Sequence, residues 1–229
     1  MGIRVVAIDG AAGSGKSTLA RLLAKELRLP YVNTGSMYRA LTLTALRGAI
    51  DVEDGRALAG LMGTLEFTLS PGPDGELLID GAPPSDDLET ADVEASVSTV
   101  AKHAPVRSAM RAAQRALGAD GAVMEGRDIG TVVFPDAPLK LFLVAAPDER
   151  AGRRVDERGV TDVGEALHAR DRLDARVNPH VPAEDAVVID TSDLSVEGTL
   201  RAALDAVTSR APGLLTPEGP PAGEEGSRR

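Results

Sequence analysis

The sequence predicts an α/β fold in which a five-stranded parallel sheet is flanked by helices. Five short apolar runs have the length and composition of fully buried strands, and segments with helical periodicity separate them. Strands that alternate with helices are typical of parallel sheets, because two parallel neighbours need a long crossover connection. At 229 residues, 43% of them hydrophobic, the chain is long enough to form one domain with a sizeable core.

The predicted elements follow one another along the chain in an alternating order. The expected strands are IRVVAI at 3–8, YVN at 31–33, AVME at 122–125, LKLFLV at 139–144 and AVVID at 186–190. The expected helices span residues 16–28, 35–47, 103–117, 148–157, 163–176 and 195–208. Continuous apolar runs of this length, in place of a polar alternation, indicate strands that are buried on both faces.

Residues 63–83 break this alternation. The apolar runs LEFTL and ELLID flank SPGPDG, a turn-rich stretch that favours a small hairpin. The hairpin lies within residues 48–100, which hold 12 acidic residues and one basic residue, whereas the whole chain has a net charge of −10. We therefore expect residues 48–100 to form an insertion on a single domain that spans 1–210.

Two further segments have a distinct composition. Residues 147–176 contain seven arginines and eight acidic residues and are expected to form a charged helical pair joined by a turn at Gly159. Residues 211–229 are rich in Pro, Gly and Glu, a composition that buries too little apolar surface to offset the entropy of ordering. We expect this tail to be disordered.

Composition excludes several classes of function. The chain has no cysteine, which excludes disulfides, cysteine zinc sites and a thiol nucleophile and fits a reducing compartment. No apolar run approaches the ~18 residues of a membrane span. An acidic chain without a basic face is a poor nucleic-acid binder. The sequence thus predicts a monomeric, cytoplasmic protein whose partners are neither nucleic acids nor membranes.

The strongest motif is GAAGSGKST at 10–18, which lies between the first expected strand and the first expected helix. It fits the pattern G-x-x-x-x-G-K-[ST], for which a chain of this composition gives about 0.005 chance matches. Glycines let successive backbone N–H groups converge on a phosphate, and the helix N-terminus adds its positive end. Lys16 would reach the β- and γ-phosphates and Ser17 would ligate Mg²⁺. The motif predicts that the chain binds a nucleoside triphosphate, ATP.

Arginines follow two further strands and also lie in the charged segment. They occur in NTGSMYRA at 33–40, in MEGRDIGTVVFPDA at 124–137 and in RDRLDAR at 170–176. Ligands of open parallel sheets bind beyond the carboxyl ends of the strands, so the first two stretches should face the same crevice as the glycine loop. Glu125, at the end of the third strand, is a candidate to hold Mg²⁺ through water.

These stretches carry a resemblance to a known family. The chain resembles bacterial cytidylate kinases of the nucleoside monophosphate kinase group, in order from residue 3 to about 208. The matching pieces are IDGAAGSGKST, NTGSMYRAL, SVSTVAKHAPVR, QRAL, EGRDIGTVVFPDAPLKLFL, ERAGRR, RDRLDAR and VPAEDAVVIDTSDLS. The resemblance implies a P-loop nucleoside monophosphate kinase fold, with residues 48–100 as the monophosphate-binding insertion and 147–176 as a helical lid. The implied reaction is phosphoryl transfer from ATP to CMP or dCMP.

The resemblance also implies roles for individual residues. The ATP-binding residues would be Gly10, Ala11, Ala12, Gly13, Ser14, Gly15, Lys16, Ser17, Thr18 and Arg154, with Arg150, Arg153 and Arg158 as further charge donors on the lid. The CMP phosphate would be held by Arg39 and Arg127, the cytosine by Ser98, Arg107 and Asp128, and the sugar by Arg170 and Asp174. Arg176 would bridge phosphates, so the catalytic set would be Lys16, Arg39, Arg127 and Arg176.

The chain departs from the family pattern at two places. The family spaces its last pair as D-x-x-R, whereas Asp174-Ala175-Arg176 is one residue shorter. The acidic residue that the family places before S-G is replaced in Asn33-Thr34-Gly35, where Thr34 retains a hydroxyl for the substrate side.

Other functions remain open on sequence alone. One is a kinase for a different small acceptor, such as UMP, AMP or shikimate, against which the Ser98, Arg107 and Asp128 set argues. A nucleotide-gated switch or regulatory ATPase would need a water-positioning residue and a partner surface, and neither is evident. A non-catalytic nucleotide-binding module would have no need of Lys16 and the several arginines.

Overall fold

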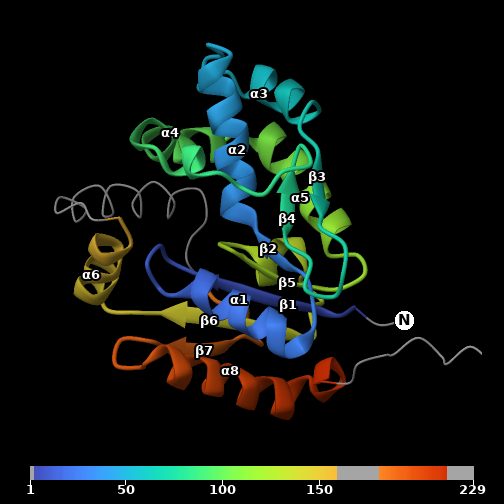
Figure 1. The fold of residues 1–229 in the computed structure, drawn as a ribbon, viewed down its shortest axis with the longest axis vertical. Coiled ribbons are helices and arrows are strands. Elements are labelled where there is room, and N and C mark those ends of the chain that lie inside the picture. Colours follow the sequence, from blue (N-terminus) through green and yellow to red (C-terminus); the bar gives the residue numbers. More distant parts are fainter. Residues whose placement is uncertain (1–2, 159–180, 216–229) are drawn as a thin grey trace, which may run out of the picture.

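The computed structural model describes residues 3–158 and 181–215 and contains the predicted five-stranded parallel sheet (Figure 1). The strands are β1 (Val5–Gly10), β2 (Tyr31–Asn33), β5 (Ala122–Gly126), β6 (Leu139–Val144) and β7 (Val187–Asp190). Their order in the sheet is β2-β5-β1-β6-β7, with every neighbouring pair parallel. All five strands predicted from the apolar runs are confirmed.

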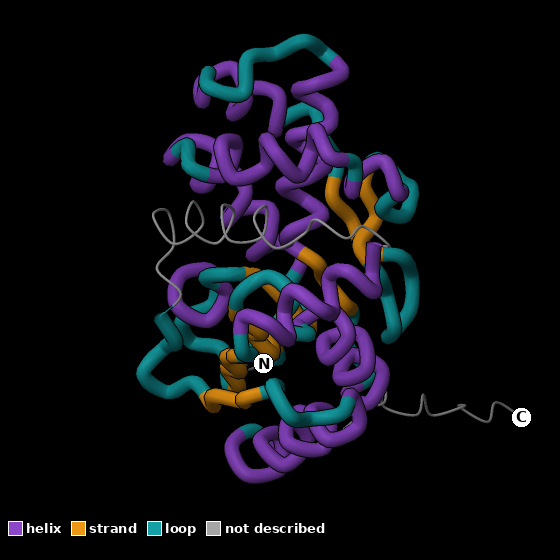
Figure 2. The backbone as a smooth tube through the Cα atoms, turned by 90° about the vertical axis from the view of Figure 1, so that its left-hand side faces the viewer, coloured by secondary structure: helices purple, strands orange, loops and turns teal. Residues whose placement is uncertain are grey.

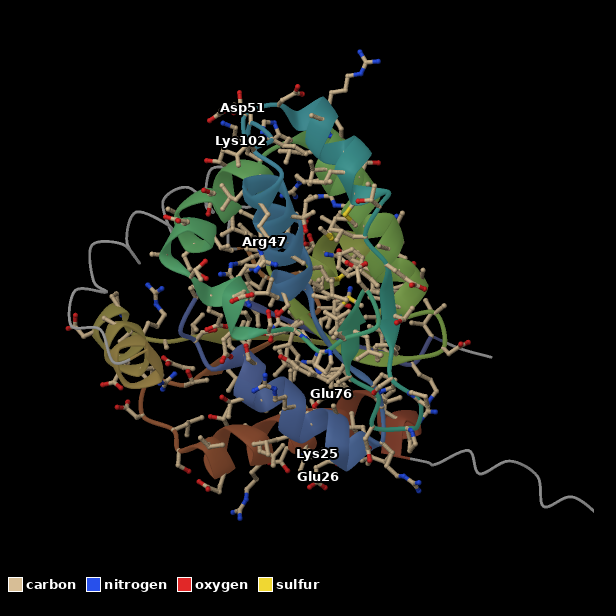
Figure 3. All side chains as sticks on the ribbon, turned by 45° about the horizontal axis from the view of Figure 1, so that its top comes forward. Lys25, Glu26, Arg47, Asp51, Glu76 and Lys102 are labelled. Carbon is tan, nitrogen blue, oxygen red and sulfur yellow. The ribbon has the colours of Figure 1, made fainter. Side chains whose placement is uncertain are left out.

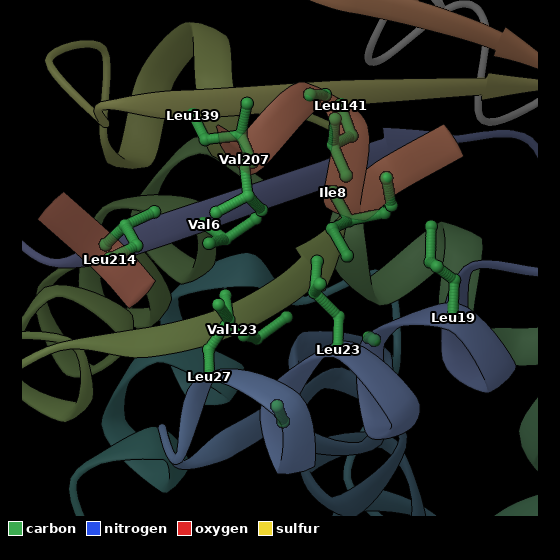
Figure 4. Packing of buried hydrophobic residues seen from close by; sticks show 14 of the residues in the cluster. Val6, Ile8, Leu19, Leu23, Leu27, Val123, Leu139, Leu141, Val207 and Leu214 are labelled. Atoms are coloured by element: carbon green, nitrogen blue, oxygen red, sulfur yellow. The ribbon is translucent and has the colours of Figure 1, made fainter. Parts of the chain in front are cut away.

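One face of the sheet is covered by α1 (Lys16–Leu27) and α8 (Val196–Arg210). Successive strand residues point to opposite faces, so Val6 and Ile8 of β1 pack here with leucines of α1 and β6 (Figure 4). Both residues are completely buried. Because the side chains in this layer are almost all aliphatic, the chain forms its core with few aromatic residues.

The other face is covered by α2 (Thr34–Arg47) and α5 (Ala104–Leu117), together with the insertion. Val5 and Ala7 of β1 point to this side, where they meet Met37 of α2 and Met110 of α5. In the view turned by 90°, α2, α5 and the insertion form the upper half of the molecule, above the sheet (Figure 2). The sheet is therefore buried between two helical layers, as the uninterrupted apolar strands predict.

The insertion contains the predicted hairpin and two helices that the sequence analysis missed. The hairpin strands β3 (Phe67–Leu69) and β4 (Leu77–Ile79) pair antiparallel. The additional helices are α3 (Gly55–Met62) and α4 (Ala91–Ala101), which is preceded by a 3₁₀ turn at Asp86–Glu89. The Tyr31 N–H donates to the Gly75 carbonyl at 2.9 Å, so the hairpin loop covers the edge of β2. An edge that would otherwise expose free backbone groups is thereby paired.

Basic residues beside the insertion compensate part of its negative charge. Arg47 pairs with Asp87 at 2.7 Å, and Lys102 pairs with Glu53 at 2.6 Å. Lys102 lies at the outer end of the insertion, far from the charged residues of α1 (Figure 3). These pairs are exposed, and such pairs typically contribute only about 0–1 kcal/mol to stability. Among the described residues, no helix combines the length and apolar composition needed to cross a membrane.

The core extends past the boundary that was expected at residue 211. A 3₁₀ turn at Pro212–Leu215 follows α8, and Ala211 and Leu214 belong to the core on the α1 side. Leu214 is only 3% exposed, beside Leu139 and Val207 (Figure 4). The average composition of 211–229 does not reveal that Leu214 packs in the core, because a single buried leucine changes this average very little. Residues 216–229 lie outside the described residues.

Asp9, at the end of β1, ties the glycine loop to the segment that follows β5. Its Oδ1 accepts the Ile129 N–H at 2.8 Å, and its Oδ2 accepts the Gly130 N–H at 2.7 Å. These donors begin a π-helical turn at Ile129–Val133, directly after Arg127 and Asp128. Burial, together with the nearby charge of Asp128, raises the pKa of Asp9 from 3.8 to about 6. The two N–H groups and Lys16 oppose this rise.

We predict that Leu214→Ala lowers the free energy of unfolding by about 2–4 kcal/mol, because truncating a buried leucine loses apolar burial and leaves a cavity. The matched control is Leu215→Ala, since Leu215 is 46% exposed. Its effect should stay within about 0.5 kcal/mol. Urea unfolding of both variants measures the difference, and equal losses would show that Leu214 does not dock as described.

We also predict that Asp9 makes stability depend on pH. Between about pH 4 and 6 the folded state holds a proton on Asp9 that the unfolded state has released, so rising pH lowers the free energy of unfolding. The rise in pKa from 3.8 to about 6 corresponds to about 3 kcal/mol.

The measurement is urea unfolding of the wild type and Asp9→Asn from pH 4 to pH 8. The difference in free energy of unfolding, wild type minus variant, should decrease by about 2 kcal/mol between pH 4 and pH 8, because part of the total is already lost below pH 4. A difference that is constant with pH would contradict the raised pKa.

Candidate nucleotide-binding site

The glycine loop has the backbone geometry that its sequence predicts. Gly10, Gly13 and Gly15 have φ values of 149°, 74° and 88°, which residues with a Cβ rarely adopt. A Cβ on Gly10 would also lie 2.4 Å from the Leu143 carbonyl oxygen of β6. The loop leads directly into α1, which begins at Lys16. Residues 11–15 therefore connect the carboxyl end of β1 to the N-terminus of α1, and residues 16–18 form the first turn of that helix.

Lys16 lies over this loop and is 6% exposed. Its Nζ donates to the Ala11 carbonyl at 2.6 Å, an acceptor that a phosphate oxygen could replace. The Ser14 hydroxyl is completely buried and has no hydrogen-bond partner among the described residues. A buried hydroxyl without a partner, in a glycine loop that leads into a helix N-terminus, suits a phosphate oxygen.

The start of α6 (Pro147–Arg158) packs against the glycine loop. Arg150 is 9% exposed, and its Nη1 donates to the Ala12 carbonyl at 3.2 Å. Arg153 donates to the hydroxyl and carbonyl of Thr191 at 3.0 and 2.6 Å. Thr191 in turn donates to the Ser14 carbonyl at 3.2 Å. Arg150 and Arg153, two of the arginines expected on the lid, therefore lie beside the glycine loop.

The carboxyl ends of β2, β5 and β1 lie side by side and bring the predicted acceptor stretches to the glycine loop. Glu125 of β5 aligns with Asn33 of β2 and with Ile8 of β1. The Thr34 hydroxyl donates to the Glu125 carbonyl oxygen at 2.7 Å and fixes the start of α2 against β5. The expectation that these stretches share one edge of the sheet is confirmed.

Glu125 is 4% exposed at this edge. The Tyr31 hydroxyl donates to its Oε1 at 2.6 Å. Burial and the adjacent carboxylate raise the pKa of Tyr31, so the phenol stays protonated and acts as the donor. In the part of the chain that the structure describes, no three His, Cys, Asp or Glu side chains gather to hold a metal ion. A magnesium ion here would rely on few protein ligands, as it commonly does beside phosphates.

Arg39 of α2 is 9% exposed and faces the insertion. Its guanidinium lies 3.9 Å from a carboxylate oxygen of Glu89 and 3.9 Å from one of Glu94, and its Nη2 is 3.4 Å from the Ser36 hydroxyl. The sequence does not predict the contacts of Arg39 with these two glutamates, because no local pattern links them to it. These contacts are long for charge-assisted bonds, which a phosphate would form at shorter distance.

Arg107 of α5 and Asp128 form a direct ion pair, with Nη2 and Oδ2 2.9 Å apart. Arg111, one helical turn later, donates to the same oxygen at 3.0 Å. Burial and the Asp128 carboxylate raise the pKa of Tyr38 to about 12, against the opposing charges of Arg107 and Arg111. The structure thus brings together two predicted residues and adds Arg111 and Tyr38, which were missed. The four-residue spacing of Arg107 and Arg111 was the available signal.

The other predicted residues differ in how far the structure describes them. Ser98 is 7% exposed on α4, and Arg127 is half-buried after β5. Ser17 is half-buried in the first turn of α1, with Thr18 exposed beside it. Arg154 and Arg158 lie in α6, but their side chains are outside the described part. Arg170, Asp174 and Arg176, with the second half of the expected lid, also lie outside the described residues.

Comparisons with known proteins agree with this arrangement. The family model for cytidylate kinase matches residues 6–209. The chain is 44% identical to a cytidylate kinase of Geobacillus thermodenitrificans over 216 residues, which is 90% of this chain and 96% of that protein. It is also 44% identical to a cytidylate kinase of Enterococcus faecalis over 213 residues, 88% of this chain and 94% of that one.

A solved structure resembles the fold. The crystal structure of TT1252 from Thermus thermophilus matches with a TM-score of 0.50 at 20% sequence identity, over 92% of this chain and 99% of that one. At this identity the likeness concerns the fold alone. The family model and the close relatives together cover nearly the whole described core, and the chain therefore belongs to the cytidylate kinase family.

Proposed function

We propose that this chain transfers the γ-phosphate of ATP to CMP or dCMP and so forms ADP and CDP or dCDP. The observation that carries the proposal is the Arg107–Asp128 ion pair. Asp128 directly precedes the turn whose N–H groups bind Asp9, and Asp9 lies next to the glycine loop. A donor site for a triphosphate and a polar pair suited to cytosine are thereby fixed to the same end of β1.

The donor triphosphate would bind along residues 10–18. Backbone N–H groups, the buried Ser14 hydroxyl and Lys16 supply hydrogen bonds and positive charge to the phosphates. Arg154, in the helix that packs on this loop, would add charge. The Ser17 hydroxyl, with Glu125 acting through water, offers the oxygen ligands that suit Mg²⁺. A bound magnesium ion would neutralise part of the charge on the β- and γ-phosphates.

The acceptor phosphate would be held by Arg39 and Arg127. Phosphoryl transfer brings two anions together, so the principal task of the protein is positioning and charge stabilisation. The acceptor phosphate has a second pKa near ~6 and is already anionic at neutral pH, so no general base is required. Thr34 would contribute a hydroxyl to the acceptor side, Arg170 and Asp174 would hold the sugar, and Arg176 would contact the phosphates during transfer.

The base would be recognised by Ser98, Arg107 and Asp128. Cytosine carries an amino donor at its 4-position and acceptors at N3 and the 2-carbonyl. An ionised Asp128 only accepts and a guanidinium only donates, so the pair is complementary to cytosine. Uracil reverses two of these groups and would face Asp128 with a carbonyl. This argues against UMP as the principal acceptor.

We further propose that the protein acts as a monomer in the cytoplasm. The absence of cysteine, which suits a reducing compartment, supports this location. The direct test of the whole proposal is a coupled assay of ADP release with CMP, dCMP, UMP, AMP and GMP. Rapid release that depends on CMP or dCMP, with little ATP hydrolysis in its absence, is the expected outcome. Hydrolysis without any acceptor would instead indicate a regulatory ATPase.

We predict that Lys16→Ala lowers kcat by at least about 100-fold, because Lys16 stabilises charge that develops on the transferred phosphoryl group. The matched control is Lys25→Ala, on the same helix but exposed, which should keep wild-type kcat. Steady-state kinetics with CMP measures both variants. A Lys16→Ala enzyme with near wild-type kcat would exclude the proposed role.

We predict that the wild type prefers CMP over UMP by at least about 100-fold in kcat/KM, because each mispaired buried group costs roughly 1–3 kcal/mol. Asp128→Ala and Arg107→Ala should each shrink this ratio, chiefly by impairing CMP. Asp120→Ala serves as the control, since Asp120 is exposed in the turn before β5. Equal use of UMP and CMP by the wild type, or an unchanged ratio in both variants, would refute the assignment.

A further inference from the structure

Three arginines of α5, four residues apart, bind the segment that follows β5 from end to end. Arg107 and Arg111 donate to Asp128 Oδ2 at 2.9 and 3.0 Å. Arg115 donates to the carbonyls of Val132 and Val133 at 2.8 and 2.9 Å. Positions i, i+4 and i+8 lie along one helix face, so α5 presents this row to the π-helical turn. The first two arginines contact a side chain, and the third contacts main chain alone.

Two guanidinium groups contact the single carboxylate of Asp128. One carboxylate, 18% exposed, is contacted by two guanidinium groups that are 13% and 27% exposed. One cation would suffice to compensate the carboxylate, and two partly buried cations on the same oxygen repel each other. Both contacts use the same carboxylate oxygen, Oδ2. The contact of Arg111 with an oxygen that Arg107 also binds therefore points to a role of Arg111 at Asp128 itself.

We propose that Arg111 is a positioning residue for base selectivity, and that it keeps Asp128 paired and oriented while Arg107 binds the base. This inference rests on the proposed function. Arg107 donates hydrogen bonds to N3 and the 2-carbonyl of cytosine. Its interaction with Asp128 is weakened as a result. Arg111 stays on Oδ2 and holds Oδ1 toward the 4-amino group. When the nucleotide is bound, Arg111 thus remains the arginine that pairs with Asp128.

Selectivity follows from this division of roles. Without Arg111, binding of cytosine would leave Asp128 partly uncompensated and free to rotate, which weakens CMP. Uracil presents a carbonyl to the same carboxylate and gains nothing from a rigid Asp128. Loss of Arg111 should therefore affect CMP more than UMP, and it should leave ligands without a base unaffected.

The test compares Arg111→Leu and Arg111→Lys with Arg115→Leu in the full chain. Arg115 binds the same segment through main-chain carbonyls, so its loss loosens the segment without removing charge from Asp128. Kinetic constants are measured with CMP, UMP and ATP, and inhibition constants with ribose 5-phosphate, which has the phosphate and sugar but no base. Thermal melting of each variant reports folding.

Arg111→Leu should raise the KM for CMP about tenfold, the effect of losing one charge-assisted hydrogen bond, and should keep kcat within about twofold. The KM for UMP and for ATP and the inhibition constant for ribose 5-phosphate should change less than about threefold. Arg111→Lys keeps the charge and should restore the KM for CMP to within about threefold of wild type. Should Arg111→Leu not fold, Arg111→Gln carries the same expectations.

Several outcomes would overturn the inference. They are an unchanged KM for CMP in Arg111→Leu, an equal loss for CMP and ribose 5-phosphate, and the same change of selectivity in Arg115→Leu. The last two would show that Arg111 only stabilises the segment. A wild-type enzyme without CMP-dependent ADP release would refute the proposed function itself, which separates that failure from a failure of the Arg111 assignment.

Discussion

The double hydrogen bond of Asp9 is the constraint on which the site depends. The end of β1 leads into the glycine loop, and the carboxylate of Asp9 binds the two N–H groups that begin the turn after Asp128. The glycine loop and the segment after β5, which are the proposed donor and acceptor halves of the site, are therefore joined through one side chain over a sequence separation of 120 residues. Burial of this carboxylate costs stability at neutral pH. In return, Asp9 fixes the relative position of the two segments that are proposed to bind the phosphates, and phosphoryl transfer would depend on that position.

In the unliganded protein, several cationic side chains of the site bind acceptor groups of the protein itself. A partly buried cation without a partner would be costly, so the unliganded chain needs these substitutes. The acceptors are the backbone carbonyls of Ala11 and Ala12 and the carboxylates of Glu89, Glu94 and Asp128, which receive Lys16, Arg150, Arg39 and Arg107. On the proposed roles, nucleotide binding would exchange these protein acceptors for oxygen and nitrogen atoms of the ligand, and no further cation of the protein would have to be buried.

The sequence predicts the sheet, the glycine loop and the hairpin, because each depends on local periodicity or on a compact motif. It does not predict the helices α3 and α4, which are short and lie in a segment whose acidic composition suggested only an insertion. It also misses Asp9 and Arg111 as site residues, since their partners Ile129 and Asp128 are adjacent only in the folded chain. The docking of Leu214 is missed for the same reason, because composition averages over the one residue that packs.

The two arginine sites differ in how closely carboxylates approach them, and this difference fits their proposed roles. Arg39 lies 3.9 Å from Glu89 and from Glu94, whereas Arg107 and Arg111 bind Asp128 at 2.9 and 3.0 Å. Loosely held acceptors are readily replaced by an incoming phosphate, which binds guanidinium groups more strongly than a distant carboxylate does. Asp128, which Arg111 contacts at 3.0 Å, would instead keep its orientation if Arg111 has the positioning role proposed above. On the proposed roles, phosphate binding would replace the distant carboxylates beside Arg39. Base recognition would replace only the Arg107 contact, while Arg111 stays on Asp128.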